Sequence, residues 1–93
     1  MDTTIKLRLY VIGESARAQR AISRLEDILE NNFEGKYTLE VVDLLERPQL
    51  AEEEKIMATP TVVRKLPPPL RKIVGDLSDE QQVLVGLDLA PEA

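Results

Sequence analysis

The chain has 93 residues, of which 43% are hydrophobic and 31% are charged, and its formal net charge is −5 with no cysteine and no histidine. This length is enough for one domain, so a single domain over residues 1–93 is expected, with an aliphatic core because Trp is absent and aromatic residues are rare. The missing thiols and imidazoles exclude thiolate nucleophiles, disulfides and thiolate or imidazole metal sites, and the acidic balance argues against general nucleic-acid binding.

The first two predicted elements are a strand and a long helix. Residues 5–12 alternate apolar and polar side chains, which is the period of a half-buried strand, and Gly13 ends it. From Ser15, a suitable N-cap residue, apolar side chains recur at helical spacing for roughly four to five turns until Gly35. The N-terminal residues lack the apolar segment of a signal peptide, and no run reaches the about 18 apolar residues of a membrane span, so a cytoplasmic protein is expected.

A second strand and a short helix follow. Residues 37–44 return to a strand pattern, and the adjacent Val41 and Val42 suit a central strand that is covered on both faces. The order strand, helix, strand predicts a right-handed unit with two parallel strands. Pro48 is compatible with a first helical turn, so residues 50–57 are predicted as a short helix.

The next segment predicts an antiparallel strand pair. Short apolar runs at residues 62–63 and 70–74 flank Pro67, Pro68 and Pro69, which cannot lie inside a strand ladder and therefore form a stiff turn.

Charge is distributed unevenly along this part of the chain. Residues 64–72 contain four bases and no acid, whereas the residues from Asp76 onward contain acids and no base. Such asymmetry is typical of a face that meets a charged partner, and it is equally typical of ordinary solvated elements. The four bases are Arg64, Lys65, Arg71 and Lys72.

The last segment carries the patterns of two different structures. Ser78 and Gln81 form a capping box that predicts a helix from Ser78 through Leu89. The alternation of apolar residues from Val83 to Leu89 instead indicates a strand, and Gly86 lowers helix stability by roughly 1 kcal/mol relative to Ala. Both interpretations stay open on the sequence alone.

The order of these elements resembles a thioredoxin-like α/β domain, in which the proline before the third strand, here Pro60, is usually cis and faces the start of the first helix. A redox enzyme of that fold needs a thiol at this corner, where residues 13–17 provide none. The carboxylates of residues 52–54 diverge on a helix and cannot chelate a metal together, and the glycines form no phosphate-binding motif. No enzymatic activity, metal or cofactor is therefore expected.

Several blocks of sequence, spread over nearly the whole chain, are similar to the KaiB family of cyanobacterial circadian clock proteins. These blocks are Leu9–Gly13, Pro48–Glu53, Lys55–Thr61, Leu66–Pro69, Ile73–Asp79 and Val83–Leu89.

The resemblance implies a non-enzymatic adaptor that binds the N-terminal ATPase ring of the KaiC hexamer and regulates its phosphorylation cycle and output signalling. It further implies capture of KaiA, displacement of the kinase SasA and engagement of the phosphatase CikA. The residues expected to contact KaiC are Arg20, Gln49, Leu50, Arg64, Arg71 and Lys72. An alternative is a diverged signalling or stress-response module that binds a kinase without a clock function.

The resemblance also assigns an edge strand to KaiA and CikA. Its residues are Thr38 and Glu40, where clock members typically carry Ala and Lys. The charge reversal at Glu40 predicts weak binding of KaiA.

The family is metamorphic, which implies that two folds compete. One is a thioredoxin-like βαβαββα monomer and the other is a tetramer with a rearranged C-terminal half. The switch is expected at Pro60, Pro67, Pro68, Pro69, Gly86, Asp88 and Ala90. Because Ala90 and Pro91 stand where the family has a tyrosine, and proline cannot donate to a strand ladder, the thioredoxin-like state is expected and mainly as a monomer.

Overall fold

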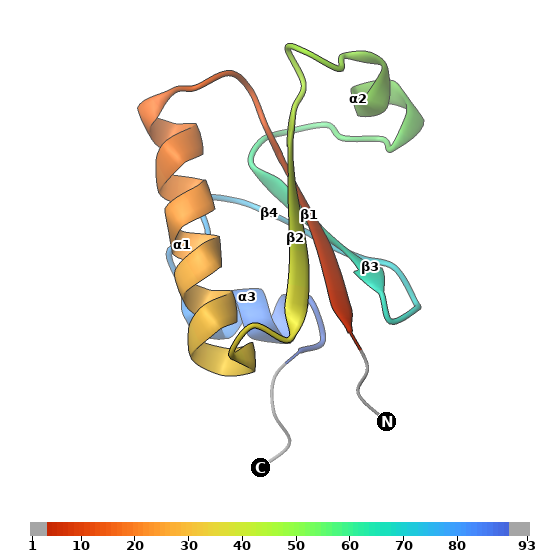
Figure 1. Ribbon diagram of the computed structural model, residues 1–93. Helices are drawn as coiled ribbons and strands as arrows, with labels where there is room; N and C mark the ends of the chain where they lie inside the picture. Colours follow the sequence, from red (N-terminus) through yellow and green to blue (C-terminus); the bar gives the residue numbers. More distant parts are fainter. Residues whose placement is uncertain (1–3, 90–93) are drawn as a thin grey trace.

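The computed structural model describes residues 4–89, which form a mixed sheet with three helices (Figure 1). The sheet has the strand order β2-β1-β3-β4; β1 and β2 are parallel, whereas β3 is antiparallel to β1 and β4 is antiparallel to β3. This is the βαβαββα order that the sequence predicts. The elements are β1 (Ile5–Val11), α1 (Ala16–Phe33), β2 (Tyr37–Asp43), α2 (Gln49–Glu53), β3 (Thr61–Leu66), β4 (Arg71–Val74) and α3 (Glu80–Gly86).

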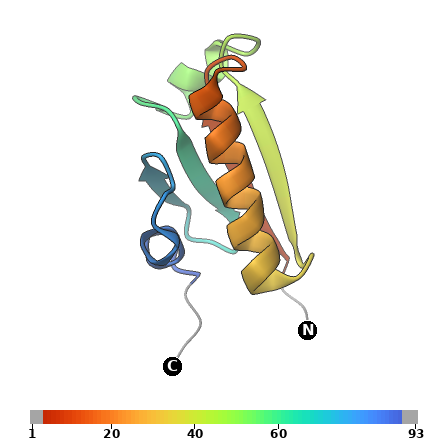
Figure 2. The same cartoon turned by 90° about the vertical axis from the view of Figure 1, so that its left-hand side faces the viewer.

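The helices cover the two faces of the sheet unequally. Helices α1 and α3 lie on one face, and α2 lies on the other face near one end of the strands (Figures 1 and 2). Between residues 4 and 89, no helix is both long enough and apolar enough to span a bilayer.

The first helix begins and ends where the sequence predicts. The Ser15 hydroxyl accepts a hydrogen bond from the Ala18 N–H (3.1 Å), which satisfies one of the free donors of the first turn. At the other end, Glu34 and Gly35 both take positive φ angles of 46° and 82°, a conformation that ends helices and favours glycine at the second position.

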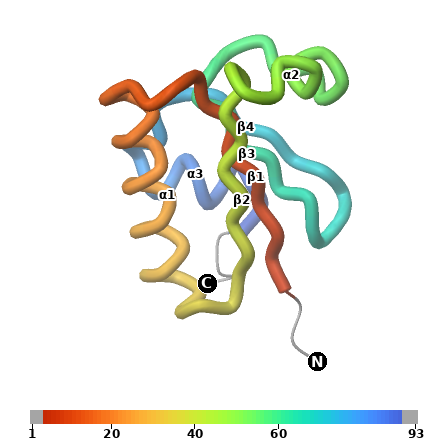
Figure 3. Tube along the Cα trace, turned by 45° about the horizontal axis from the view of Figure 1, so that its top comes forward, coloured from red at the N-terminus to blue at the C-terminus, as the bar shows by residue number. Residues whose placement is uncertain are grey.

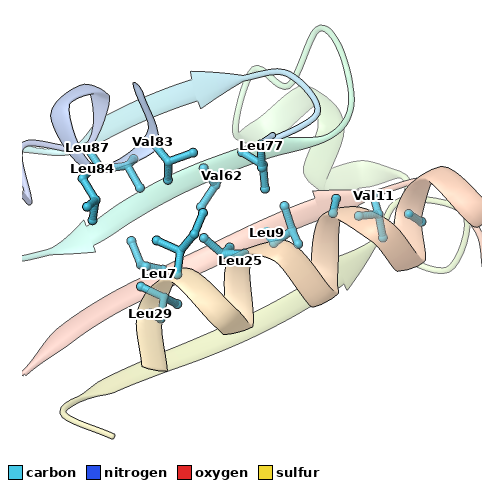
Figure 4. Close-up of a cluster of buried hydrophobic side chains, with 13 residues drawn as sticks. Leu7, Leu9, Val11, Leu25, Leu29, Val62, Leu77, Val83, Leu84 and Leu87 are labelled. Atoms are coloured by element: carbon cyan, nitrogen blue, oxygen red, sulfur yellow. The ribbon is translucent and has the colours of Figure 1, made fainter. Parts of the chain in front are cut away.

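The main core lies between the sheet and the pair α1 and α3. Alternate residues of β1, namely Leu7, Leu9 and Val11, point toward the buried stripe of α1 (Figure 4). Helix α3 adds Val83 and Leu84, which are buried in the same cluster.

A second, smaller core lies beneath α2 on the opposite face. It contains Tyr10, Val42, Leu44, Leu50 and Val63, with Ala51 and Ile56 packed against it. This cluster fixes α2 to the ends of β1 and β2.

Two expectations for the middle of the chain are wrong. Strand β2 is an edge strand, and Val41 is exposed while only Val42 is buried, because β1 and not β2 lies at the centre of the sheet. Helix α2 ends at Glu53 and does not reach Met57, because Lys55 takes a positive φ of 56° that a continuing helix cannot contain.

The last segment is a helix, but its bounds differ from the prediction. Asp79 and not Ser78 is the N-cap, since its carboxylate accepts from the Gln82 N–H (3.2 Å) while the Ser78 N–H is already bound by the Asp76 carboxylate (3.0 Å). The helix stops at Gly86, short of Leu89. The expectation placed on Ala90 lies outside the described residues.

The prolines flank β3. The peptide bonds Thr59–Pro60, Leu66–Pro67 and Pro68–Pro69 are cis, and residues 67–69 form the connection between β3 and β4 that the sequence predicts.

Candidate protein-interaction surfaces

Three large apolar side chains are exposed at the end of the molecule where the parallel strands finish. Ile12 follows β1, Leu45 follows β2 and Met57 follows α2, and their exposed fractions are 51%, 69% and 95%. Figure 3 tilts this end toward the viewer, with α2 near the ends of both strands. We call Ile12, Leu45 and Met57 the strand-end surface, because Leu45 lies against Gly13, next to Ile12, and Thr59, two residues after Met57, lines a cavity together with Ile12.

The backbone around the strand-end surface is held by one carboxylate. Asp43 Oδ1 accepts from the N–H groups of Gly13 (2.8 Å) and Leu45 (2.9 Å), and the Leu44 N–H donates to the Val11 carbonyl (2.9 Å). The chain therefore stays paired beyond the ends of β1 and β2. Gly13 has a φ of +65°, and a β-carbon there would lie 3.2 Å from Leu45 Cδ1, so Leu45 rests directly on it.

A shallow cavity of about 270 Å³ opens beside this surface. It lies where Thr59 and Pro60 face Ser15 at the start of α1, so Pro60 occupies the place expected of it. The Ser15 hydroxyl is engaged as the helix cap, and among residues 4–89 no group of three or more acidic side chains could hold a metal ion. The corner can bind a partner's side chain, but it offers no nucleophile paired with a base.

The four bases predicted as one cluster lie on opposite faces of the sheet. Strand alternation places Arg64 and Arg71 on the side of α3, whereas Lys65 and Lys72 face α2. Both lysines are bound to Glu54: Lys65 Nζ lies 3.0 Å from its carboxylate, and Lys72 Nζ donates to its carbonyl (2.6 Å).

Two of the residues expected to contact KaiC are buried. Arg64 is 3% exposed; its guanidinium donates to the carbonyls of Asp88 (3.1 Å) and Pro69 (2.8 Å), and its Nε has no partner among the described residues. Leu50 is buried in the smaller core. Neither side chain is available to a partner in this conformation, because each fills an interior position.

The other four expected contacts are exposed but do not form one patch. Arg20 and Gln49 lie toward the strand-end surface, on α1 and at the start of α2. Arg71 and Lys72 are exposed on β4, the opposite edge strand from β2.

The residues expected to face KaiA lie on an edge strand, β2, as that expectation requires. Thr38 is exposed, and Glu40 forms ion pairs with Arg8 (2.7 Å) and Arg47 (3.8 Å). The hydrogen bond from Arg8 to the Tyr10 hydroxyl, and to a smaller extent the one to Glu40, raises the pKa of Arg8 above its ordinary value. Glu40 is therefore held against the sheet by its neighbours.

Among the positions expected to switch fold, Gly86 and Asp88 lie at the end of α3 and just after it, whereas Pro60 faces the start of α1. The Asp88 carbonyl binds Arg64, as described above, and Asp88 itself takes a positive φ of 56° just after the helix. Gly86 lies against Ile73 of β4, beside a cavity of about 600 Å³ between β4 and α3.

Sequence reasoning missed the strand-end surface and Asp43. Ile12, Leu45 and Met57 look like core residues in the sequence, since each directly follows another large apolar residue. The one available signal was an acidic residue, Asp43, at the end of a predicted strand.

This chain is similar to known proteins both in its amino-acid sequence and in its fold. A family model described as the KaiB domain matches residues 8–89. The chain is 57% identical over 86 residues to the circadian clock oscillator protein KaiB of Prochlorococcus marinus subsp. pastoris, covering 92% of this chain and 80% of the relative. It is 56% identical over 92 residues to the protein of the same description from Picosynechococcus, covering 99% and 88%.

Among solved structures, the N-terminal domain of SasA from Synechococcus elongatus matches with a TM-score of 0.77 at 23% identity, covering all of this chain and 91% of that domain. Mitochondrial thioredoxin 3 from Saccharomyces cerevisiae matches with a TM-score of 0.70 at 18% identity, covering 90% and 76%. At these identities the likeness concerns the fold alone, and it confirms the thioredoxin-like α/β fold.

Proposed function

Because the chain belongs to the KaiB family of circadian clock proteins, we propose that it is a non-enzymatic adaptor for the N-terminal ATPase ring of a KaiC-type hexamer. Binding would regulate the ring's phosphorylation cycle and its output signalling. The observation that carries this proposal is the strand-end surface, where three large apolar side chains are exposed on a small domain without a catalytic group beside them.

The composition of this end of the molecule suits a protein partner. Interfaces combine an apolar centre with a polar rim, and here exposed side chains of both charges lie close in sequence to Ile12 and Leu45, namely Glu14, Arg17, Glu46 and Arg47. A rim of mixed charge specifies orientation more than it adds affinity. The proposed contacts are the strand-end surface, Arg20 and Gln49, together with Arg71 and Lys72 on the edge strand β4.

Further partners follow from the same family membership. We assign KaiA and CikA to the edge of β2 around Thr38 and Glu40, where an extended segment could add to the sheet. SasA would compete for the ring. The adaptor would act in the cytoplasm, bind no nucleic acid or membrane, and be mainly a monomer.

The test is co-elution of the chain with a purified KaiC-type hexamer in size-exclusion chromatography, in ATP and in ADP. Leu45→Glu places a charge in the strand-end surface and should weaken binding tenfold or more, because a buried unpaired carboxylate is strongly unfavourable. Val85→Glu is the matched control, since Val85 is similarly exposed (63%) but lies on α3.

The outcomes separate the possibilities. Binding by the parent chain and by Val85→Glu, but not by Leu45→Glu, supports both the function and its surface. Equal binding by all three proteins would reject the surface. No binding by the parent in either nucleotide would reject the adaptor function and favour a signalling module without a clock role.

A further inference from the structure

Met57 is exposed to a degree that is unusual for a large apolar side chain. Its exposed fraction is 95%, the highest among the exposed large hydrophobic residues of the described chain. Because the sequence contains no cysteine, a thioether is the most readily oxidised side chain that it can offer to a peroxide.

The backbone on both sides of Met57 is fixed, so its exposure is a property of the fold. The Ile56 N–H donates to the Ala51 carbonyl (2.8 Å), and the Ile56 side chain packs against the smaller core. On the other side, the Thr61 hydroxyl donates to the Ala58 carbonyl (2.6 Å). With both neighbours anchored, the Met57 side chain is held out into solvent.

We propose that Met57 is a reversible oxidation site that controls docking at the strand-end surface. This inference rests on the proposed function, since that surface is the one assigned to the ring. Hydrogen peroxide transfers one oxygen atom to the thioether sulfur, which is oxidised to the sulfoxide, while the peroxide is reduced to water. A methionine sulfoxide reductase, drawing two electrons from a dithiol, returns the thioether and releases the oxygen as water.

Oxidation changes the surface without changing the fold. The sulfoxide is polar, and burying it against a partner without a hydrogen bond disfavours the complex, so binding should weaken about tenfold. Met57 contributes almost no buried area, so the stability of the domain should stay the same.

The first experiment measures the reaction itself. Cleavage after Lys55 and Arg64 releases residues 56–64, which contain Met57 as their one methionine. After dilute peroxide this peptide should gain the mass of one oxygen atom as fast from the folded protein as from the chain unfolded in urea. Treatment with a methionine sulfoxide reductase and a dithiol should reverse the gain. Oxidation that is several-fold slower in the folded protein would overturn the proposal.

The second experiment measures docking. The chain is oxidised, freed of peroxide and then mixed with an untreated KaiC-type hexamer. The parent should bind about tenfold more weakly after oxidation. Met57→Leu, whatever its own affinity, should bind equally before and after peroxide, which excludes effects at Met1. Met57→Gln should bind as weakly as the oxidised parent and be insensitive to peroxide.

The two proposals fail in different ways. If the untreated parent binds the ring and the oxidised parent binds equally well, the oxidation site is wrong and the adaptor function stands. If the untreated parent does not bind, the adaptor function is wrong and control of docking falls with it.

Discussion

Gly86 of α3 packs directly against Ile73 of β4: a β-carbon at position 86 would lie 2.5 Å from Ile73 Cγ2. The helix and the edge strand therefore approach more closely than any larger residue would allow without a shift. The sequence suggests only that Gly86 weakens a helix, whereas the fold gives the glycine a packing role.

This contact predicts a coupling between the two positions. Gly86→Ala should strengthen α3 through helix propensity by about 1 kcal/mol but must displace the Ile73 methyl group, for which the neighbouring cavity offers room. In an Ile73→Ala background the displacement is absent, so Gly86→Ala should be more favourable there by about 1 kcal/mol in urea unfolding. Ile73→Val keeps both γ-carbons and should not relieve the contact. Equal effects in all three backgrounds would contradict the prediction.

The hydrogen bonds of Arg64 predict that the stability of α3 depends on a second contact with the sheet. Its guanidinium is the donor for the carbonyls of Pro69 and Asp88, so it joins the proline loop to the end of α3. Arg64→Met keeps the apolar stem but leaves both carbonyls without this donor, and should lower local stability by about 1–2 kcal/mol.

Amide hydrogen exchange checks this effect. The N–H groups of Leu87 and Leu89, which bond within and just after α3, should lose protection more than those of α1. Arg64→Lys should retain part of the amide protection that Arg64→Met loses. A uniform loss across the whole domain would argue that Arg64 acts only through general packing.

Asp76 predicts a pH dependence in the loop before α3. The hydrogen bond from the Ser78 hydroxyl, and to a smaller extent the one from the Ser78 backbone N–H, lowers the pKa of Asp76 below its ordinary value. The stabilisation that this carboxylate gives is therefore complete above the ordinary aspartate pKa of about 3.9, and it is lost as the pH falls through the lower folded value. The Ser78 amide resonance should titrate with a midpoint below that of the unfolded chain. Asp76→Asn should abolish the titration, and a midpoint at or above the ordinary value would refute the assignment.

The sequence predicts the elements of the fold better than their positions in it. Ser15 and the apolar stripe of α1 are local signals that agree, so that helix is predicted correctly. Whether β2 lies at the centre or at the edge of the sheet depends on how the other strands pair. The two apolar residues Val41 and Val42 do not show which position it takes. At the start of α3, Ser78 and Asp79 are both good caps, and the contact with Asp76 decides between them.

The candidate surfaces could also be predicted only in part from the sequence. Strand alternation by itself is enough to separate Arg64 from Lys65, because neighbouring residues on a strand face opposite sides of the sheet. The exposure of Ile12, Leu45 and Met57 could not be predicted, since it depends on where the ends of separate elements meet.

Arg71 predicts an electrostatic contribution to ring binding. It is exposed, and among the described residues it forms no ion pair. Arg71→Glu should slow association with an acidic surface of the ring, most strongly at low salt, while dissociation changes little. Lys36→Glu is the matched control, because Lys36 precedes β2, the edge strand on the other side of the sheet from β4. Stopped-flow association rates that are equal for the parent, Arg71→Glu and Lys36→Glu would remove Arg71 from the interface.

Glu40 predicts that the ring-bound chain captures KaiA weakly. The resemblance to clock members places a lysine at this position, whereas here a carboxylate lies on the edge of β2 and is held by Arg8 and Arg47. Thr38→Ala combined with Glu40→Lys should therefore increase KaiA in the ternary complex, measured by size-exclusion chromatography. The new lysine would face Arg8, so a modest loss of stability, about 0.5–1 kcal/mol, should accompany the gain. Glu40→Ala separates the two effects, because it removes the opposing charge without creating a like-charge pair. Tight ternary assembly by the unmodified chain would show that the charge at position 40 does not decide KaiA capture.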